Sequence, residues 1–558
     1  MRKFILIDHS LRDLGGHHYP YAVSVLQAAA AAGWSPVLAT HRDFRHVEVF
    51  PATWRILPLF PRPSYSRYTL DTQSTAMEAA AAGWRHWLGA LQRRWQQRHR
   101  AALSRHFAAG CAELFTRVEV ARGDLVFVGT ASELDLQGLM RFLATAGAER
   151  IRPSQLTWHL QFHFGIQRGR FMPEFARLAA ADRMRESMRA ALAQLPAADV
   201  HFWCTTDELS AQYTALGLRP FRTLPYPVHP RFAGTGAPRS PATPARIACL
   251  GHARREKGHG VLPSLLRALW GDYFARGRAQ LVVQNARPKL RQQLQQTVTE
   301  LSAPAGAAPG SVDCSAGALD MEQYAALVRG SDIGLLLYDA DRYHDRCSGV
   351  LLEMQVAGIP VIVPAESWLA AQIDPFNQSW LRTESDRLAA DNRLLPLKGE
   401  LELNWIALPE RCTTLLVRLF WPRQSQQSAL IRICLTQKDS AGNEQQYVLS
   451  TTRDPLHPTS LALFRVSAAT VQIHLRQQRP NGTEPAPDTR LSACVVRGAT
   501  VPLGAVGLAI VGQQQAPAAV RDILDFIEHY RMQAAIRAPQ RARDCSAAGI
   551  VSRLTEQA

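Results

Sequence analysis

The segment between Cys347 and Val363 combines residue types that could bind a phosphorylated, hydroxyl-rich ligand. Ser348 and Gly349 are typical of a tight turn, and the residues after them predict a helix of about three turns that opens near Glu353 and precedes a buried strand. The start of a helix presents unpaired backbone N–H groups and a partial positive charge, which favour phosphate. A carboxylate in the first turn can accept hydrogen bonds from ligand hydroxyls. Phosphate beside vicinal hydroxyls predicts a nucleotide or a nucleotide sugar.

Two series of alternating strand and helix patterns place this segment within a larger α/β framework. The first series predicts strands at residues 4–7, 36–39, 124–128, 156–160 and 200–204. A linker rich in Gly, Pro, Thr and Ser follows at 234–245. The second series predicts strands at residues 246–250, 280–283, 333–337 and 360–363. Because continuous apolar strands that alternate with helices favour a parallel sheet covered on both faces, the sequence predicts two doubly wound domains in tandem.

From about residue 397 the apolar pattern changes from a helical period to strict alternation. Three sets of alternating residues predict strands that each bury one face: Leu415, Val417 and Leu419; Ile431, Ile433 and Leu435; and Val471, Ile473 and Leu475. Residues 439–443 predict a hairpin turn between two such strands. About seven short strands over roughly a hundred residues favour an antiparallel sandwich. A strand at 506–511 and a helical tail at 517–556 then return to the α/β pattern.

We therefore expect an α/β protein of two Rossmann-like doubly wound domains with an inserted antiparallel β-sandwich. The expected N-terminal domain spans residues 1–230, and the second domain spans 246–395 and is closed by 503–558. The inserted β-sandwich spans 396–502. In a fold of this kind a ligand binds at the carboxyl ends of the strands, so the functional residues are expected on the loops there.

The composition restricts the class of protein. Hydrophobic residues make up 47% and charged residues 20% of the 558 residues, as in ordinary globular proteins. No apolar run reaches the roughly 18 residues of a membrane span. Residues 1–8 predict a first strand instead of a signal peptide. The nine cysteines are scattered without metal-ligand spacing, which favours a reducing cytoplasm and argues against a structural zinc.

The net charge of +16 indicates acidic partners: nucleotide phosphates, anionic lipid surfaces or nucleic acid. General solubility of an Arg-rich chain explains the charge equally well. No motif of RNA- or DNA-binding proteins supports nucleic acid as a specific partner. The segment 78–118 has apolar residues at helical spacing among arginines: Trp84, Trp87, Leu88, Leu91 and Trp95. Such a helix can lie peripherally on an anionic membrane, or it can pack on its own domain.

Three segments resemble motifs of one protein family. The stretch from Gly251 to Gly258, GHARREKG, follows a predicted strand and resembles the Gly-Arg-Leu-x-x-x-Lys-Gly segment of the retaining GT-B glycosyltransferases of the large "group 1" family. Asp345 and Glu353 have the spacing of that family's Glu-x7-Glu motif. Residues 8–19 are similar to its glycine-rich amino-terminal loop. The resemblance covers most of the chain outside the expected β-sandwich.

Carried onto this sequence, the resemblance implies roles for the basic loop and for Glu353. Gly251, Arg254 and Lys257 would bind the donor, and Lys257 would neutralise the diphosphate as it leaves. The family's Arg after the first Gly is replaced here by His252, and Arg254 would supply the missing cation as part of the catalytic pair. A solvated basic loop is the alternative. Glu353 would hold the ribose hydroxyls of the donor, or it would only complement the helix dipole.

The resemblance also implies that Asp345 is a catalytic residue next to the donor sugar. An Asp there is one methylene shorter than the family's Glu, and a surface loop charge is the alternative. Ser348 and Gly349 would offer backbone N–H groups to phosphate, or would form a simple turn. Gly15 and Gly16 would let the backbone approach the donor without a Cβ in the way, or would also be only a turn.

Two further positions follow predicted strands. His159 and His163 are four residues apart, and only His163 reaches the cleft if the strand ends near residue 160. The family carries a His at about this place, which implies that His163 contacts the donor sugar or the leaving oxygen in catalysis. A buried structural His is the alternative. Ser132 and Asp135 predict a helix cap, and contact with the acceptor is the less favoured alternative.

As a whole, the resemblance implies a cytoplasmic, hexosyltransferase-type glycosyltransferase. It would transfer a sugar from a nucleotide-diphosphate sugar to a glycan, lipid-linked or small-molecule acceptor, with retention of configuration, in surface polysaccharide or glycoconjugate synthesis. The donor is a substrate, and no cofactor is expected. The sequence shows no acidic metal cluster, so Arg254 and Lys257 are expected to take the place of a metal ion. Two alternatives stay open: a sugar-nucleotide epimerase or hydrolase on the same scaffold, and a non-catalytic carbohydrate-binding protein whose β-sandwich binds the sugar.

Overall fold

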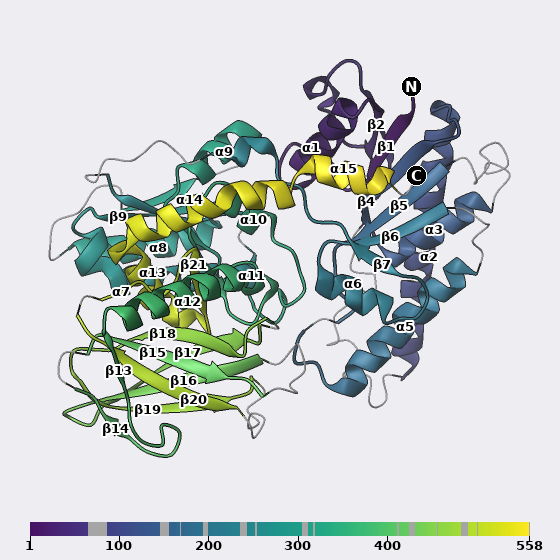
Figure 1. Cartoon of the computed structure of the whole chain (residues 1–558). Helices are drawn as coiled ribbons and strands as arrows, with labels where there is room; N and C mark the ends of the chain where they lie inside the picture. Colours follow the sequence, from purple (N-terminus) through teal and green to yellow (C-terminus); the bar gives the residue numbers. More distant parts are fainter. Residues whose placement is uncertain are drawn as a thin grey trace.

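A computed structural model describes most of the chain (Figure 1). Outside the description lie residues 65–85, 145–155, 168, 194–198, 235–242, 252–253, 304–310, 316–318, 410–411, 423–429, 455, 481–488, 499 and 557–558, and the side chains of 86–94 and 255. Two lobes, each built around a parallel sheet, face one another, and a module of antiparallel strands lies against the second lobe. The predicted combination of two doubly wound sheets and an antiparallel β module is confirmed for the described residues.

The first lobe contains a seven-stranded sheet in the order β3-β2-β1-β4-β5-β6-β7, in which all neighbours are parallel. Its strands are β1 Lys3–Asp8, β2 Ser35–His41, β3 Arg55–Phe60, β4 Asp124–Ala131, β5 Leu156–Phe162, β6 Asp199–Cys204 and β7 Phe221–Thr223. Its main helices are α1 His18–Ala31, α2 His86–Arg117, α3 Glu133–Leu143, α5 Glu174–Leu192 and α6 Asp207–Thr214. The predicted cap of α3 is confirmed, because the Ser132 side chain accepts from the Asp135 amide and the Asp135 carboxylate accepts from the Ser132 amide.

The second lobe contains a six-stranded parallel sheet in the order β10-β9-β8-β11-β12-β21. Its strands are β8 Ala245–Cys249, β9 Ala279–Gln284, β10 Val312–Ser315, β11 Ile333–Leu335, β12 Val361–Pro364 and β21 Gly507–Ile510. Its helices are α7 Leu262–Leu269, α8 Pro288–Ser302, α9 Met321–Arg329, α10 Gly349–Val356, α11 Trp368–Ala371, α12 Asp374–Ala390, α13 Ala516–Asp525, α14 Ile527–Asp544 and α15 Ala547–Thr555. The strand at the end of the chain therefore completes a sheet that begins before the β module.

The predicted start of α10 is wrong. The helix begins at Gly349, directly after its N-cap Ser348, and ends at Val356. The Ser348 side chain accepts a hydrogen bond from the amide of Leu351, which fixes the first turn four residues earlier than expected. Glu353 consequently lies in the second turn, where its carboxylate points from the helix body instead of capping it, and the helix is shorter than three turns.

The β module consists of two four-stranded sheets with antiparallel pairing, in the orders β13-β20-β15-β18 and β14-β19-β16-β17. Its strands are β13 Leu394–Pro396, β14 Ile406–Ala407, β15 Thr414–Phe420, β16 Leu430–Asp439, β17 Glu444–Thr452, β18 Thr459–Arg465, β19 Thr470–Gln478 and β20 Arg490–Val496. The predicted hairpin turn lies between β16 and β17. Buried side chains from both sheets form one core, as expected for a sandwich, although Val471 is exposed at the start of β19.

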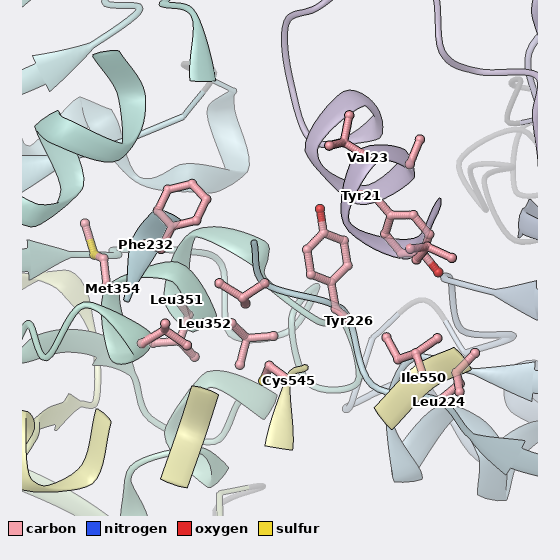
Figure 2. Close-up of a cluster of buried hydrophobic side chains, with 14 of the residues drawn as sticks. Tyr21, Val23, Leu224, Tyr226, Phe232, Leu351, Leu352, Met354, Cys545 and Ile550 are labelled. Atoms are coloured by element: carbon pink, nitrogen blue, oxygen red, sulfur yellow. The ribbon is translucent and has the colours of Figure 1, made fainter. Parts of the chain in front are cut away.

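The two lobes share one apolar core. Figure 2 shows buried side chains from α1, from the connection between the lobes, from α10 and from the C-terminal helices packed around Tyr226. Helix α15 leaves the second lobe and packs against α1 of the first, as the yellow ribbon in Figure 1 shows. The amide of Val228 also donates to the carbonyl oxygen of Cys545 over 2.9 Å. This shared core holds the lobes in a defined relative position.

No helix among the described residues is long and apolar enough to cross a membrane. The expected membrane-facing side chains Trp84, Trp87, Leu88 and Leu91 lie outside the described residues or side chains. Trp95 is half exposed and packs on the His99 ring, with a centroid separation of 4.0 Å. Peripheral contact of this segment with an anionic membrane therefore stays a prediction.

Candidate functional site

A cleft of about 280 Å³ opens between the lobes at the carboxyl ends of the parallel strands. The position agrees with the rule that ligands of doubly wound sheets bind at that edge. Nine of the predicted site residues line the cleft: Gly15, Gly16, His163, Gly251, Arg254, Lys257, Ser348, Gly349 and Glu353. The tenth, Asp345, does not line it. The cleft therefore joins the glycine-rich loop of the first lobe to the basic loop and α10 of the second.

Lys257 places an ammonium group in this cleft without an anionic partner. No ion pair among the described residues includes its Nζ, which lies 5.0 Å from the centroid of the Tyr338 ring. Burial lowers the pKa of Lys257, because removal from water disfavours the charged form. Gly251 has a φ of 90°, and a Cβ there would lie only 2.5 Å from the Lys257 Nζ. A half-buried cation of this kind is stabilised by an anion that enters the cleft.

Arg254 adds a second cation to the same wall. Its side chain is largely exposed, and its Nη1 lies 4.0 Å from Glu256 Oε1, so it is only weakly engaged within the protein. Both Arg254 and Lys257 line the cleft. His252, which stands where the family has its Arg, lies outside the described residues. The basic loop thus offers one exposed and one half-buried cation to a ligand.

The start of α10 faces these cations. Ser348, Gly349 and Val350 line the cleft, and the first amides of a helix have no partner within the helix. A Cβ on Gly349 would lie 3.2 Å from the ring of Tyr226, so a larger residue would press against the connection between the lobes. The helix start and the basic loop together form an arrangement suited to a phosphate or a diphosphate.

Glu353 is the carboxylate that α10 brings to the cleft, which Glu256 and Asp320 also line. Its Oε2 accepts a hydrogen bond of 2.8 Å from the hydroxyl of Tyr324. Burial raises the pKa of Glu353 to about 7, and the Tyr324 hydrogen bond and the Lys257 charge oppose this increase. The side chain is therefore partly ionised at neutral pH. In the ionised form it can accept further hydrogen bonds from hydroxyls of a ligand bound at the helix start.

On the opposite wall, His163 directly follows β5 and contacts the backbone of the first lobe. Its Nε2 lies 2.7 Å from the carbonyl oxygen of Gly129, and because a carbonyl only accepts, Nε2 carries the proton. Burial lowers the pKa of His163 to about 4, so the ring is neutral at pH 7. This tautomer has an acceptor at Nδ1 and no proton there to give to a leaving oxygen. His159, by contrast, lies within the sheet, where its Nδ1 accepts from Trp203 Nε1.

The glycine-rich loop forms the rest of that wall. The amide of Gly15 donates to Asp13 Oδ1 over 2.8 Å, and Gly16 has a φ of 77°, which favours glycine. The next residue, His17, lines the cleft, and burial together with nearby positive charges lowers its pKa well below the ordinary value. A neutral His17 adds no charge, so the cations of the cleft, Arg254, Lys257 and Arg346, all belong to the second lobe.

Asp345 is the predicted residue that the structure does not bring to the cleft. Its side chain is almost completely buried, and its Oδ2 accepts from Gln212 Nε2 of α6 over 2.8 Å. Its carbonyl oxygen accepts from the Thr206 hydroxyl, and a Cβ on Gly165 would overlap its carboxylate. Asp345 is therefore neither beside the donor position nor a surface loop charge. It docks the loop before α10 on the first lobe.

Several cleft residues were not identified from the sequence. Tyr324, Tyr338, Asn285, Arg346 and Tyr226 all line the cleft. Asn285 has a φ of 51° directly after β9, and its place at the carboxyl end of a predicted strand could have marked it. The two tyrosines of the second lobe and the connection residue Tyr226 had no such signal, because their direction depends on packing between distant segments.

No group of three or more His, Cys, Asp or Glu side chains in the described part of the chain is placed to hold a metal ion. The polar groups of the cleft include cations, helix amides, tyrosine hydroxyls, a neutral imidazole and the carboxylates of Glu256, Asp320 and Glu353. These groups match an anionic ligand that also carries hydroxyls.

Comparisons with known proteins give a limited result. No family model and no curated protein matches the sequence. Among solved structures, the chain is similar to a sucrose-phosphate synthase from Thermosynechococcus elongatus, with 16% identity, 70% of this chain and 90% of the other covered, and a TM-score of 0.43. It is also similar to an α,α-trehalose 6-phosphate synthase from Burkholderia multivorans, with 12% identity, coverage of 67% and 86%, and a TM-score of 0.41. At these values a function has to be inferred from the cleft itself.

Proposed function

We propose that this chain is a GT-B glycosyltransferase that transfers a sugar from a nucleotide-diphosphate sugar to a hydroxyl of an acceptor. The proposal includes retention of configuration and catalysis by protein cations in place of a metal ion. A glycan, a lipid-linked sugar or a small molecule is the acceptor, and synthesis of surface polysaccharide or glycoconjugates is the setting. The two-lobe α/β architecture with a cleft at the carboxyl edges of both sheets supports this class.

The observation that carries the proposal is the half-buried ammonium of Lys257, which has no ion pair among the described residues and lies in the same cleft as the α10 start and Glu353. A diphosphate would satisfy the ammonium and the free helix amides together. The ribose hydroxyls of a nucleotide would reach a carboxylate that already has one hydroxyl partner, Tyr324. A ligand with both groups, a nucleoside diphosphate, therefore fits the cleft better than a free phosphate or a free sugar.

In the reaction, the bond between the sugar's anomeric carbon and the diphosphate breaks while the acceptor oxygen bonds to the same carbon. Negative charge grows on the leaving diphosphate, and Lys257, Arg254 and the amides of α10 stabilise it most at that moment. The acceptor approaches from the face that the diphosphate leaves, and its proton passes to a leaving phosphate oxygen. No covalent bond to the protein forms in this scheme.

Of the two roles expected for His163, the proposal keeps contact with the donor sugar and omits contact with the leaving oxygen. Because the neutral ring of His163 lines the cleft, we assign it to orienting the donor sugar. Protonation of the leaving oxygen is not assigned to it, because its Nε2 proton is held by Gly129. Asp345 has no role in the chemistry proposed here, because it lies against α6.

The test combines binding and turnover in four proteins: wild type, Lys257→Ala, Glu353→Ala and Lys289→Ala, which removes an exposed lysine of α8 as a matched control. Calorimetry with a panel of nucleoside diphosphates and assays with the matching nucleotide sugars measure both properties. Lys257→Ala and Glu353→Ala should abolish transfer with unchanged circular dichroism, and Lys289→Ala should behave like wild type. Full transfer activity in both cleft variants would refute the proposal.

The same experiment separates the alternatives. Consumption of a nucleotide sugar without any acceptor would favour an epimerase or hydrolase on this scaffold. Failure of the wild-type protein to bind every nucleoside diphosphate of the panel would favour a non-catalytic carbohydrate-binding protein.

A further inference from the structure

A second cavity, larger than the cleft, lies where the β module meets the second lobe. Its volume is about 640 Å³, which is within the usual range for small-molecule sites. Its floor is formed at the carboxyl ends of β11, β12 and β21 by Leu337, Pro364 and Ile510. Arg432 of β16 closes one wall, so the docked β module contributes a side chain to this cavity. We call it the module pocket.

The module pocket adjoins the cleft. Glu256 and Tyr338 line both cavities, one at the end of the basic loop and the other after β11. Tyr338 is buried, and its hydroxyl lies near Ser348 without forming a hydrogen bond of ordinary geometry to a described residue. A ligand in the module pocket would therefore sit beside the proposed donor site and could satisfy a polar group shared by the two cavities.

The wall of the module pocket contains a strained and strongly held residue. Glu366 has a φ of 61°, a left-handed conformation that is rare outside glycine. Arg432 binds its carboxylate with both nitrogens, Nε at 2.5 Å and Nη2 at 2.8 Å. Arg170 of the first lobe donates to the Glu366 carbonyl oxygen over 3.0 Å. All three modules of the protein thus meet at one residue of this pocket, and such strain is kept mainly where the local shape is used.

The charges of the pocket select against a second phosphate. Three carboxylates line it, on Glu256, Asp339 and Glu366, against the two guanidinium groups of Arg342 and Arg432. Arg432 is already neutralised by its pair, so little positive charge remains for an anion. The carboxylates and the side-chain oxygen of Gln513 can accept hydrogen bonds from hydroxyls, and the guanidinium groups can donate to them. The floor of the pocket is apolar. This mixture suits the hydroxyl edges and C–H faces of an uncharged sugar.

We infer that the module pocket binds an uncharged carbohydrate, the part of a glycan acceptor next to the reacting sugar, and that the β module serves to build this site. The assignment of the sugar as acceptor depends on the proposed function, while the binding of a neutral sugar does not. In this inference the β module contributes a wall to a shared site, whereas in the non-catalytic alternative the module alone would bind the sugar.

Saturation-transfer NMR with neutral trisaccharides tests the inference, with maltotriose, mannotriose, galactotriose and chitotriose as probes and glucose 6-phosphate as the charged comparison. Ala340→Trp places a large ring in the pocket at a half-buried loop residue, and Arg342→Ala removes an exposed guanidinium. Their matched controls are Ala340→Ser and Arg267→Ala, the latter at an exposed arginine of α7. All four variants are first checked for an unchanged thermal midpoint.

At least one trisaccharide should bind the wild type and both controls. Ala340→Trp should abolish that binding, and Arg342→Ala should weaken it about tenfold, while both variants still bind a nucleoside diphosphate. Lys257→Ala should show the reverse, losing the nucleotide and keeping the sugar. Binding of no trisaccharide, binding unaffected by Ala340→Trp, or preference for the sugar phosphate would overturn the inference. If the wild type binds a trisaccharide but no nucleoside diphosphate, the result would count against the proposed function alone.

Discussion

Two consecutive stretches of the second lobe, residues 341–346 and 348–353, place their acidic side chains in different parts of the molecule. The first stretch docks on the first lobe: Asp341 Oδ1 accepts from the amide of Phe171, and Asp345 is enclosed by α6. The second stretch forms the start of α10 and lines the cleft as far as Glu353. A regular spacing of two acidic residues along the chain therefore does not imply a shared site, because a loop can turn one toward a neighbouring lobe.

The two carboxylates share burial and differ in access. Burial raises the pKa of both, and His344 and Gln212 oppose the effect at Asp345 as Tyr324 and Lys257 do at Glu353. The Asp345 carboxylate is enclosed by the protein, with Oδ2 accepting from Gln212 and Oδ1 buried without a hydrogen-bond partner among the described residues. The Glu353 side chain instead lines the cleft. The comparison assigns ligand binding to Glu353 and docking of the lobes to Asp345. Substitutions at either residue test this assignment.

The largest effect is expected from Glu353→Gln. At pH 8 this change should weaken the binding of a nucleoside diphosphate about 10- to 100-fold, because hydrogen bonds to a charged acceptor contribute roughly 1.5–3 kcal/mol. The amide keeps the size of the side chain, so the fold should be retained. Calorimetry on the purified variant measures the change. Equal nucleotide affinity in variant and wild type would show that Glu353 does not contact the ligand. Glu353 and Asp345 would then not differ in ligand binding.

The pH dependence of the same pair sharpens the comparison. The folded pKa of Glu353, about 7, is higher than its ordinary value, so its contribution to stability is present at low pH and is lost as the pH rises toward and through 7. Nucleotide affinity of the wild type should increase over that range, as the ionised carboxylate forms. The unfolding free energy of Glu353→Gln minus that of wild type should increase between pH 5 and pH 8, because only the wild type has the carboxyl group. The nucleotide affinity of the variant should not rise over this range. If nucleotide affinity rises equally with pH in both proteins, the rise comes from ionisation of the nucleotide's own phosphates and not from Glu353.

Much of the fold could be predicted from the sequence because it depends on local patterns. Each of these patterns is visible within a few neighbouring residues. Examples are the continuous apolar strands, the change to alternation near residue 397 and the cap at Ser132. Short strands such as β7 and β10 were not predicted, since their pairing is decided by the sheet around them. β3 was also missed, and it contains Pro58, a residue that argues against a strand.

The candidate site could be predicted only in part. Glycines and cations near the strand ends, such as Gly251 and Lys257, were recognisable by type and order. The direction of Asp345 was not, because it depends on Gly165 and Gln212, which are far away in the sequence and meet it only in the folded protein. The module pocket was invisible for the same reason, since Arg432 and Glu366 approach one another from separate modules.

An intermediate effect is expected from Gly165→Ala. The added methyl group would overlap the Asp345 carboxylate, and overpacking of a filled site costs about 1–3 kcal/mol of unfolding free energy. Because the strain lies between the lobes, nucleotide affinity should fall by less than in Glu353→Gln. Urea denaturation measures the loss, and Gly271→Ala, where a Cβ meets open space, is the matched control. Equal stability of the two variants would show that the docking contact contributes nothing.

The smallest effect is expected from Asp345→Asn, and its direction is informative. The folded pKa of Asp345 is raised, chiefly by burial, so the ionised carboxylate is the less favoured form and its stabilising contribution falls as the pH rises. An amide of the same shape carries no charge and can still accept from Gln212 through its oxygen. Unfolding free energy at pH 8 should therefore change by less than about 1 kcal/mol or increase, and nucleotide affinity and transfer should stay within a few-fold of wild type. A loss of transfer comparable to that of Glu353→Gln, with stability retained, would place Asp345 in the reaction after all and would mean that the loop rearranges when the donor binds.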